Sequence, residues 1–280
     1  MGKHIDKAIS EEEKAQGKVL LCCTTAKSDL KINVPGFNQN ALPVRTLPAR
    51  IENIEIKHDV ALLKLALPKA PPFAFYAGQY IDLLLPGNIS RSYSIANSPD
   101  QEGILELHIR KRENGVCSEM IFGAEPKIKE KGIVRVKGPL GTFTLQKDSD
   151  KPIVLLATGT GYAPIRSILL DLIHQNSERQ VHFYWGARQQ EDLYALEEAE
   201  VVIGRLKNAK FSPVLSKPDS DWKGENGYVQ NVAAQNYPDL SQYEVYACGS
   251  PAMTESAQSL LTQKCALPEP AFFCDAFSPA

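Results

Sequence analysis

The sequence has no long hydrophobic run, no block of like charges and no low-complexity tract. Crossing a bilayer takes about 18 to 20 uninterrupted apolar residues, and the start, Met1 to Asp6, lacks the apolar core of an export signal. The net charge is only −2, and lysines and arginines are spread along the chain, so no basic face is available to neutralise a nucleic-acid backbone. These absences predict a cytoplasmic protein that binds neither membrane nor nucleic acid.

The cysteines also lack a recognisable pattern. No Cys-x-x-Cys and no cysteine–histidine cluster with zinc-finger spacing occurs. Scattered cysteines in a chain of this size are typical of reduced thiols, and no complete metal site is expected. The six residues are Cys22, Cys23, Cys117, Cys248, Cys265 and Cys274.

What is present is a short amino-terminal segment followed by two regions of different rhythm. With 280 residues, 43% of them hydrophobic, the chain can form two cores of ordinary domain size. Residues 1–43 contain a helix-start pattern, Ser10 to Glu13, then two short strands and a turn-rich linker. Residues 44–147 contain six short strands separated by Gly, Pro and Asn, which predicts an antiparallel β-barrel. Residues 148–280 alternate apolar strands with helices, which predicts an α/β domain with a parallel sheet.

Two motifs in the predicted barrel can bind a nucleotide. Arg91-Ser92-Tyr93-Ser94 combines a guanidinium that can chelate a pyrophosphate, a ring that can cover a flavin and a hydroxyl that can bond its N5 edge. The same tetrapeptide also fits an ordinary solvated strand. Gly115-Val116-Cys117-Ser118 leads from a turn into a helix whose free amides can hold phosphate, although Ser118 as a local cap explains it equally well.

The strongest phosphate signal is Thr158-Gly159-Thr160-Gly161-Tyr162-Ala163-Pro164, between a predicted strand and a predicted helix. Its two glycines allow the backbone to approach a pyrophosphate, and Pro164 falls in the first helical turn, where no N–H is needed. The third glycine of the dinucleotide-binding pattern is absent, and Gly-x-Gly alone is weak. The position between strand and helix favours the functional interpretation.

Two further strand ends belong to the same predicted sheet. Tyr184-Trp185-Gly186-Ala187-Arg188 and Tyr246-Ala247-Cys248-Gly249-Ser250-Pro251 both run from a strand into a glycine turn. Because the carboxyl ends of parallel strands meet at one edge, we expect a ligand there. Cys248 is equally well explained as a small buried residue.

In this order and spacing, the five motifs resemble the ferredoxin-NADP reductase superfamily over residues 44–280. The ending Phe272-Phe273-Cys274-Asp275-Ala276-Phe277 is most similar to the CDP-6-deoxy-glucoseen reductases and to the reductases of aromatic-ring oxygenases. The resemblance implies an FAD-binding barrel at 44–147 and an NAD(P)-binding α/β domain at 148–280. It implies transfer of hydride from NAD(P)H to FAD and of single electrons to an iron–sulfur acceptor. NADH is weakly preferred, although Ser216 and Lys217 can meet a 2′-phosphate.

The resemblance also assigns site residues. Tyr93 would stack on the flavin with Ser94 near N5, Cys248 would lie beside the nicotinamide, and Asp275 and Phe277 would shape the other flavin face. The residues expected to bind a cofactor are Arg91, Ser92, Tyr93, Ser94, His108, Ile109, Arg110, Gly115, Val116, Cys117, Ser118, Thr158, Gly159, Thr160, Gly161, Pro164, Arg188, Ser216, Cys248 and Gly249.

The amino end departs from that family pattern. Relatives usually begin with a plant-type ferredoxin domain, whose cluster needs a Cys-x4-Cys-x2-Cys run and a fourth cysteine. Within residues 1–43, Ser10 to Val34 resembles only its tail, with Cys22 in the place of the fourth ligand, so no 2Fe–2S cluster is expected in this chain as written. Two other functions stay open: a stand-alone NAD(P)H:flavin reductase, and a non-catalytic FAD-binding subunit.

Overall fold

The computed structural model describes residues 42–277 together with Ala15, Thr25 and residues 27–29. Its contacts divide the chain into two compact units, Met1–Gln39 and Asn40–Ala280. The ferredoxin-like remnant expected at residues 1–43, including the helix start at Ser10 and the ligand position Cys22, lies almost wholly outside the described residues. The second unit carries everything that follows.

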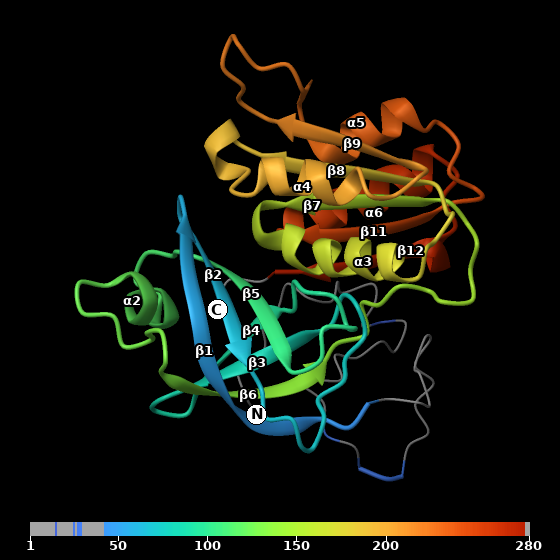
Figure 1. The fold of residues 1–280 in the computed structure, drawn as a ribbon. Coiled ribbons are helices and arrows are strands. Elements are labelled where there is room, and N and C mark those ends of the chain that lie inside the picture. The colour runs from blue at the N-terminus through green and yellow to red at the C-terminus, as the bar shows by residue number, and fades with distance from the viewer. Residues whose placement is uncertain (1–14, 16–24, 26, 30–41, 278–280) are drawn as a thin grey trace. The chain divides into compact units, whose positions relative to one another are not determined.

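The first sheet of this unit is an antiparallel barrel, as predicted (Figure 1). Its strand order is β4-β3-β6-β1-β2-β5. The two outer strands meet through a bridge between Ile95 and Leu107 and through the Ala96 N–H, which donates to the Glu106 carbonyl at 2.8 Å. The strands are β1 (Arg45–Lys57), β2 (Val60–Ala66), β3 (Tyr80–Leu85), β4 (Ile89–Ser94), β5 (Ile104–Arg110) and β6 (Ile133–Leu140).

Alternation of side chains explains why these segments form a barrel. In β3, every second residue is buried, so Ile81, Leu83 and Leu85 enter the barrel core while their neighbours face outward. In β4, the register places Arg91 and Tyr93 opposite Leu83 and Ile81, and the partly buried Tyr93 ring packs against the same core. A short helix, α2 (Val116–Phe122), follows β5 and packs Cys117 and Ile121 on the same core.

The second sheet is parallel and lies between helices, which confirms the predicted α/β architecture (Figure 1). Its order is β10-β9-β8-β7-β11-β12, so the chain leaves β7 in both directions and creates a switch point between β7 and β11. The strands are β7 (Ile153–Thr158), β8 (Val181–Ala187), β9 (Ala209–Leu215), β10 (Glu225–Asn226), β11 (Glu244–Gly249) and β12 (Phe272–Ala276).

Two helices cover each face of this sheet. The core on one face contains residues of α3 (Tyr162–His174) and α4 (Leu196–Ile203), and the core on the other contains residues of α5 (Val229–Asn236) and α6 (Pro251–Lys264). Among the described residues, no helix is long and apolar enough to cross a membrane.

The structure differs from the sequence prediction at three elements. The pattern of residues 193–202 predicts a helix over that range, but helix α4 begins only at Leu196, after a 3-10 turn at Gln190–Asp192. Helix α5 was not predicted, because it is short, its apolar residues are small and no side chain caps its amino end. Strand β12 was not predicted either, since its burial alternates only weakly and Cys274 and Ala276 are exposed at the edge of the sheet.

Candidate functional site

A cleft of about 540 Å³ is lined by barrel residues on one side and by residues of the parallel-sheet region, including Thr160 and Ala163, on the other. Strand β4 lines it with Arg91, Tyr93 and Ser94, three of the residues expected to hold a flavin. Ser94 is buried, whereas Arg91 and Tyr93 are partly exposed to the cleft. The strand therefore presents a guanidinium, an aromatic ring and a hydroxyl to one cavity.

The turn between β5 and α2 forms another wall of this cleft. Residues Gly115 to Ser118 all line it. The Ser118 hydroxyl accepts a hydrogen bond from the Arg112 N–H at 2.8 Å, so this side chain holds the turn in shape. Burial raises the pKa of Tyr93, and the adjacent Cys117 thiol raises it further, so the phenol is neutral. Burial likewise raises the pKa of Cys117.

The end of the described chain completes the cleft. Asp275 and Phe277, from β12 and the residues after it, line the cavity together with Tyr80 of the barrel. Burial raises the pKa of Asp275. The Phe277 N–H donates to the Gly249 carbonyl at 2.7 Å, which ties this segment to the end of β11.

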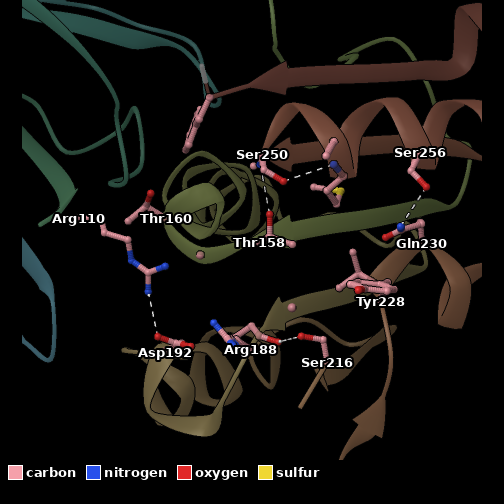
Figure 2. A pocket seen from close by; sticks show the side chains of 18 of the residues that line it. Arg110, Thr158, Thr160, Arg188, Asp192, Ser216, Tyr228, Gln230, Ser250 and Ser256 are labelled. Atoms are coloured by element: carbon pink, nitrogen blue, oxygen red, sulfur yellow. Dashed lines mark hydrogen bonds and ion pairs between the residues drawn. The ribbon is translucent and has the colours of Figure 1, made fainter. Parts of the chain in front are cut away.

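A second cleft, of about 600 Å³, lies at the carboxyl edge of the parallel sheet (Figure 2). Thr158, Gly159 and Thr160 line it after β7, Arg188 after β8, and Ser216 after β9. These are the residues that the sequence predicted for a dinucleotide. In Figure 2, Arg110 and Thr160 lie on one side of the cavity and Gln230 and Ser256 on the opposite side, with Arg188 between Asp192 and Ser216.

The glycines here permit close approach of backbone segments. A Cβ atom on Gly161 would lie 2.1 Å from the Cys248 carbonyl oxygen, so only glycine lets the turn after β7 pack on β11. Gly249 has φ of +150°, and a Cβ there would lie 2.1 Å from the Thr158 hydroxyl oxygen. The backbone segments at this edge of the sheet can therefore approach one another only because Gly161 and Gly249 have no side chain.

The two clefts share a wall formed by Arg110, Arg112, Thr160 and Phe277. The Arg110 guanidinium lies 3.0 Å from the Asp59 carboxylate and 3.6 Å from that of Asp192. Both Nε and Nη2 of Arg110 are buried without a hydrogen bond of good geometry. This arginine stands where the two cavities meet.

Four predicted site residues lie outside both clefts. Ile109 is in the barrel core, and Pro164 is buried in the first turn of α3. Gly161 is needed for packing, as above. Cys248 is fully buried in the core beneath α3, and burial raises the pKa of its thiol far above the ordinary value. In this structure all four residues contribute to packing, and their expected contact with a cofactor stays a prediction.

Two other predicted residues line a cleft but use their polar atoms in hydrogen bonds to side chains of this same protein. His108 lines the flavin-type cleft, but both of its ring nitrogens contact protein groups, Tyr194 and Glu106. Ser92 also lines that cleft, and its hydroxyl donates to the Asp82 carboxylate at 2.7 Å.

Sequence reasoning missed several residues of the dinucleotide-type cleft, among them Tyr228 and Gln230. Tyr228 lines it and is 61% exposed, which is unusual for a ring of this size. Gln230 lines it too and is buried, with its amide nitrogen on Ser256 and its carbonyl oxygen without a partner. Both residues stand at the start of α5, the helix that the sequence pattern did not reveal.

The donor sets fit two nucleotide cofactors. The barrel cleft combines the arginines Arg91 and Arg112 with an aromatic ring, which suits the pyrophosphate and ring system of a flavin. The sheet-edge cleft combines glycine turns with the unsatisfied amide oxygen of Gln230, which suits a dinucleotide. Such a fold with two adjoining clefts defines a flavin- and nicotinamide-nucleotide oxidoreductase.

Comparison with known proteins supports a flavin in the barrel cleft and a nicotinamide dinucleotide in the sheet-edge cleft. Residues 49–145 match the oxidoreductase FAD-binding domain, and residues 155–259 match the oxidoreductase NAD-binding domain. The chain is 42% identical over 274 residues to the CDP-6-deoxy-L-threo-D-glycero-4-hexulose-3-dehydrase reductase of Yersinia pestis, which covers 97% of this chain and 81% of that protein. The chain belongs to this family of FAD- and NAD-binding reductases and is an NAD(P)H-dependent flavin oxidoreductase.

Two further relatives place it within the family. The NAD(P)H-flavin reductase of Vibrio harveyi is 32% identical over 217 residues, covering 77% of this chain and 92% of that protein. The Amycolatopsis reductase GcoB has a similar structure, with a TM-score of 0.77 and 30% identity over 85% of this chain and 71% of that chain. These matches confirm the resemblance, the fold class and the two cofactors that the sequence predicted.

Proposed function

We propose that this protein takes hydride from NADH or NADPH and delivers single electrons to an iron–sulfur acceptor protein. The observation that carries the proposal is the junction of the two clefts at Arg110, Thr160 and Phe277. A bound flavin supplies the chemistry, since it accepts two electrons together and releases them singly. The protein aligns the two cofactors, and no side chain need donate a proton in the hydride step.

In the flavin cleft, the flavin would be bound mainly by side chains of β4 and by the turn before α2. Arg91 and the turn Gly115 to Ser118 would hold the pyrophosphate, with Arg112 beside them. The Tyr93 ring would cover one flavin face, and Ser94 would lie near the N5 edge. Asp275 and Phe277 would shape the other face, because they line the cavity from the side of β12.

In the dinucleotide cleft, the turn Thr158 to Thr160 would take the pyrophosphate of NAD(P)H. At the far end, the exposed Tyr228 ring offers a stacking surface for adenine, and the free carbonyl oxygen of Gln230 can accept from its amino group. Arg188 and Ser216 are the groups that a 2′-phosphate would meet. We expect NADH to be preferred, and a lower KM for NADPH would reverse that preference.

The acceptor is inferred from the relatives. The Yersinia pestis protein is by name the reductase of a hexulose dehydrase, and a protein from Rhodococcus jostii that is 34% identical to this chain is the reductase component of a propane monooxygenase. Both names describe reductases that serve another protein. We therefore propose an iron–sulfur protein as acceptor, and a deoxysugar dehydrase system as the pathway, from the higher identity.

The compartment is a related proposal. The four cysteines within the described residues, Cys117, Cys248, Cys265 and Cys274, carry free thiols, as is usual in a reducing compartment. We propose a cytoplasmic location on that ground. Fractionation of the source cells with an antibody to the protein tests it.

Two measurements on the purified protein test the central proposal. Mass analysis of the released flavin should find FAD rather than FMN, because Gly115 to Ser118 provides a second phosphate-binding turn that a monophosphate does not need. Anaerobic NADH or NADPH should then bleach the flavin absorbance. Released FMN would refute the assignment of FAD as the cofactor. A flavin that stays oxidised would favour the alternative that the protein is a non-catalytic FAD-binding subunit.

A second function is favoured by one comparison, the similarity to the Vibrio harveyi NAD(P)H-flavin reductase over most of that protein. A flavin reductase of this kind would bind its flavin loosely and release it reduced. Gel filtration separates the two functions: a protein that loses its yellow colour favours the flavin reductase, and retained colour favours the electron-transfer module.

A further inference from the structure

A group of largely buried charged and polar side chains joins the barrel to the nucleotide-binding region behind the two clefts. At its centre, Arg166 of α3 directs one nitrogen to each side. Its Nη1 donates to the Ala96 carbonyl at 2.8 Å and lies 3.4 Å from the Glu106 carboxylate, both in the barrel. Its Nε donates to the Glu198 carboxylate of α4 at 2.9 Å. The planar guanidinium therefore spans the boundary between the two regions.

The contacts continue from Glu106 to a histidine that lines the flavin cleft. Burial lowers the pKa of His108, and the bond to Glu106 offsets only part of that effect, so the ring is neutral. Its Nε2 then donates to Glu106 at 3.2 Å, and its Nδ1 accepts from the Tyr194 hydroxyl at 2.7 Å. A second chain of contacts thus crosses the same boundary.

On the other side, the contacts reach the phosphate-binding turn. The Tyr162 hydroxyl donates to Glu198, and Tyr162 directly follows the turn Gly159–Gly161. Ser167, next to Arg166, donates to the Asn97 carbonyl of the barrel at 2.7 Å. The contacts across the boundary therefore end at the walls of both cofactor clefts.

We propose that Arg166 is a positioning residue for hydride transfer: it fixes β5 of the barrel against α3 and α4 and so sets the relation of the nicotinamide cleft to the flavin cleft. The inference rests on the proposed function and deepens it. A buried ion pair is weak evidence for net stability, because desolvation opposes the attraction. The planar Arg166 guanidinium, which bonds both regions at once, nevertheless fixes the distance and the angle between them. Hydride transfer is sensitive to both, because the two cofactors must be aligned.

The test compares Arg166→Lys with Arg179→Lys in the flavin-loaded full chain. Lysine keeps the charge, but its donors all radiate from one nitrogen, so it lacks the rigid planar fork whose separate nitrogens bond the two sides. Arg179 is a matched control, since its side chain is buried and paired with Glu244 at 2.7 Å. Its other partners, the Gln146 and Lys151 carbonyls, lie in the connection between the barrel and β7, and none of its partners belongs to β5, α3 or α4. The measurements are the limiting rate of flavin reduction in single turnover, the Kd for NADH, the flavin content and the melting temperature.

Arg166→Lys should lower the limiting rate at least about tenfold, because a misplacement of about 1 Å can cost on the order of a hundredfold. Its Kd for NADH and its flavin content should stay within about twofold of the wild type, since no cofactor contact is removed. Arg179→Lys should lower the melting temperature but leave the limiting rate within about twofold. An unchanged rate in Arg166→Lys, or an equal loss in Arg179→Lys, overturns the proposal.

Should Arg166→Lys fail to fold, Ser167→Ala decides the question. It removes one hydrogen bond across the same boundary, and we expect a rate loss of about two- to fivefold at unchanged Kd. An unchanged rate in a folded Ser167→Ala protein overturns the proposal. A wild-type flavin that NADH and NADPH leave oxidised would instead overturn the proposed function itself.

Discussion

The barrel and the parallel sheet form their clefts in opposite ways. The barrel presents side chains, chiefly Arg91 and Tyr93 of β4. The parallel sheet presents backbone, and at Gly161 and Gly249 an added Cβ would collide with atoms 2.1 Å away. One cleft should therefore be damaged by removing groups and the other by adding them.

Gly161→Ala should have the largest effect, and only on the nucleotide side. The new Cβ would meet the Cys248 carbonyl, which is backbone and cannot rotate away. Overpacking of this kind costs about 3 kcal/mol of folding free energy, and NADH binding should be lost with it. Chemical unfolding and NADH titration measure both. Gly204→Ala is the control, since its Cβ would lie 3.2 Å from Glu200 in an ordinary helix end. If Gly161→Ala and Gly204→Ala had equal effects on stability and NADH binding, the close backbone approach at Gly161 would not be what the sheet-edge cleft depends on.

Arg91→Ala should weaken flavin binding and leave NADH binding intact. A charge-assisted hydrogen bond contributes about 1.5 to 3 kcal/mol, which corresponds to roughly 10- to 100-fold in the Kd for FAD. Arg91→Lys should recover only part of the loss, because lysine lacks the planar fork. Titration of the flavin-free protein with FAD gives the Kd. An unchanged value would mean that Arg91 is only a solvated strand residue.

Acid should destabilise the nucleotide-binding side through His182. Burial lowers its pKa to about 4, while the unfolded value is about 6.5. Between these values the unfolded chain binds a proton that the folded chain does not, so stability falls as the pH drops below about 6.5, by on the order of 2 kcal/mol at pH 5. Unfolding curves at pH 7 and pH 5 test this. His182→Asn should flatten the pH dependence, and an equally steep profile in that variant would refute the assignment.

Tyr93→Ala should have the smallest effect of these changes. The loss of a stacked ring costs about 0.5 to 1.5 kcal/mol beyond the area that it buries, so the Kd for FAD should rise by a small factor. Tyr93→Phe keeps the ring and should bind FAD nearly as the wild type does. If Tyr93→Phe loses as much as Tyr93→Ala, the hydroxyl near Cys117 matters and the ring does not.

The same contrast explains what the sequence predicted. Arg91 to Ser94 and Thr158 to Thr160, which line the two clefts, were predicted because their signals are local: a strand of period two, and a glycine turn between strand and helix. The six-stranded barrel and the parallel sheet follow from the same local patterns. Local sequence patterns were therefore sufficient to predict these features.

Other residues depend on neighbours that are distant in sequence. Cys248 ends a predicted strand, but only the packing of α3 over β11 decides that its thiol is buried. Tyr228 was missed because α5 has a weak apolar pattern. The contact between Arg166 and Glu106 joins residues 60 positions apart, and no periodicity reveals a pair of that kind.

The central claim is that hydride passes directly between the two clefts, and anaerobic single-turnover mixing with NADH tests it most directly. The flavin absorbance should bleach in one fast phase, and NADH deuterated at C4 on the transferred face should slow that phase about two- to fivefold, as expected when hydride transfer limits it. A flavin that both NADH and NADPH leave oxidised would contradict the claim.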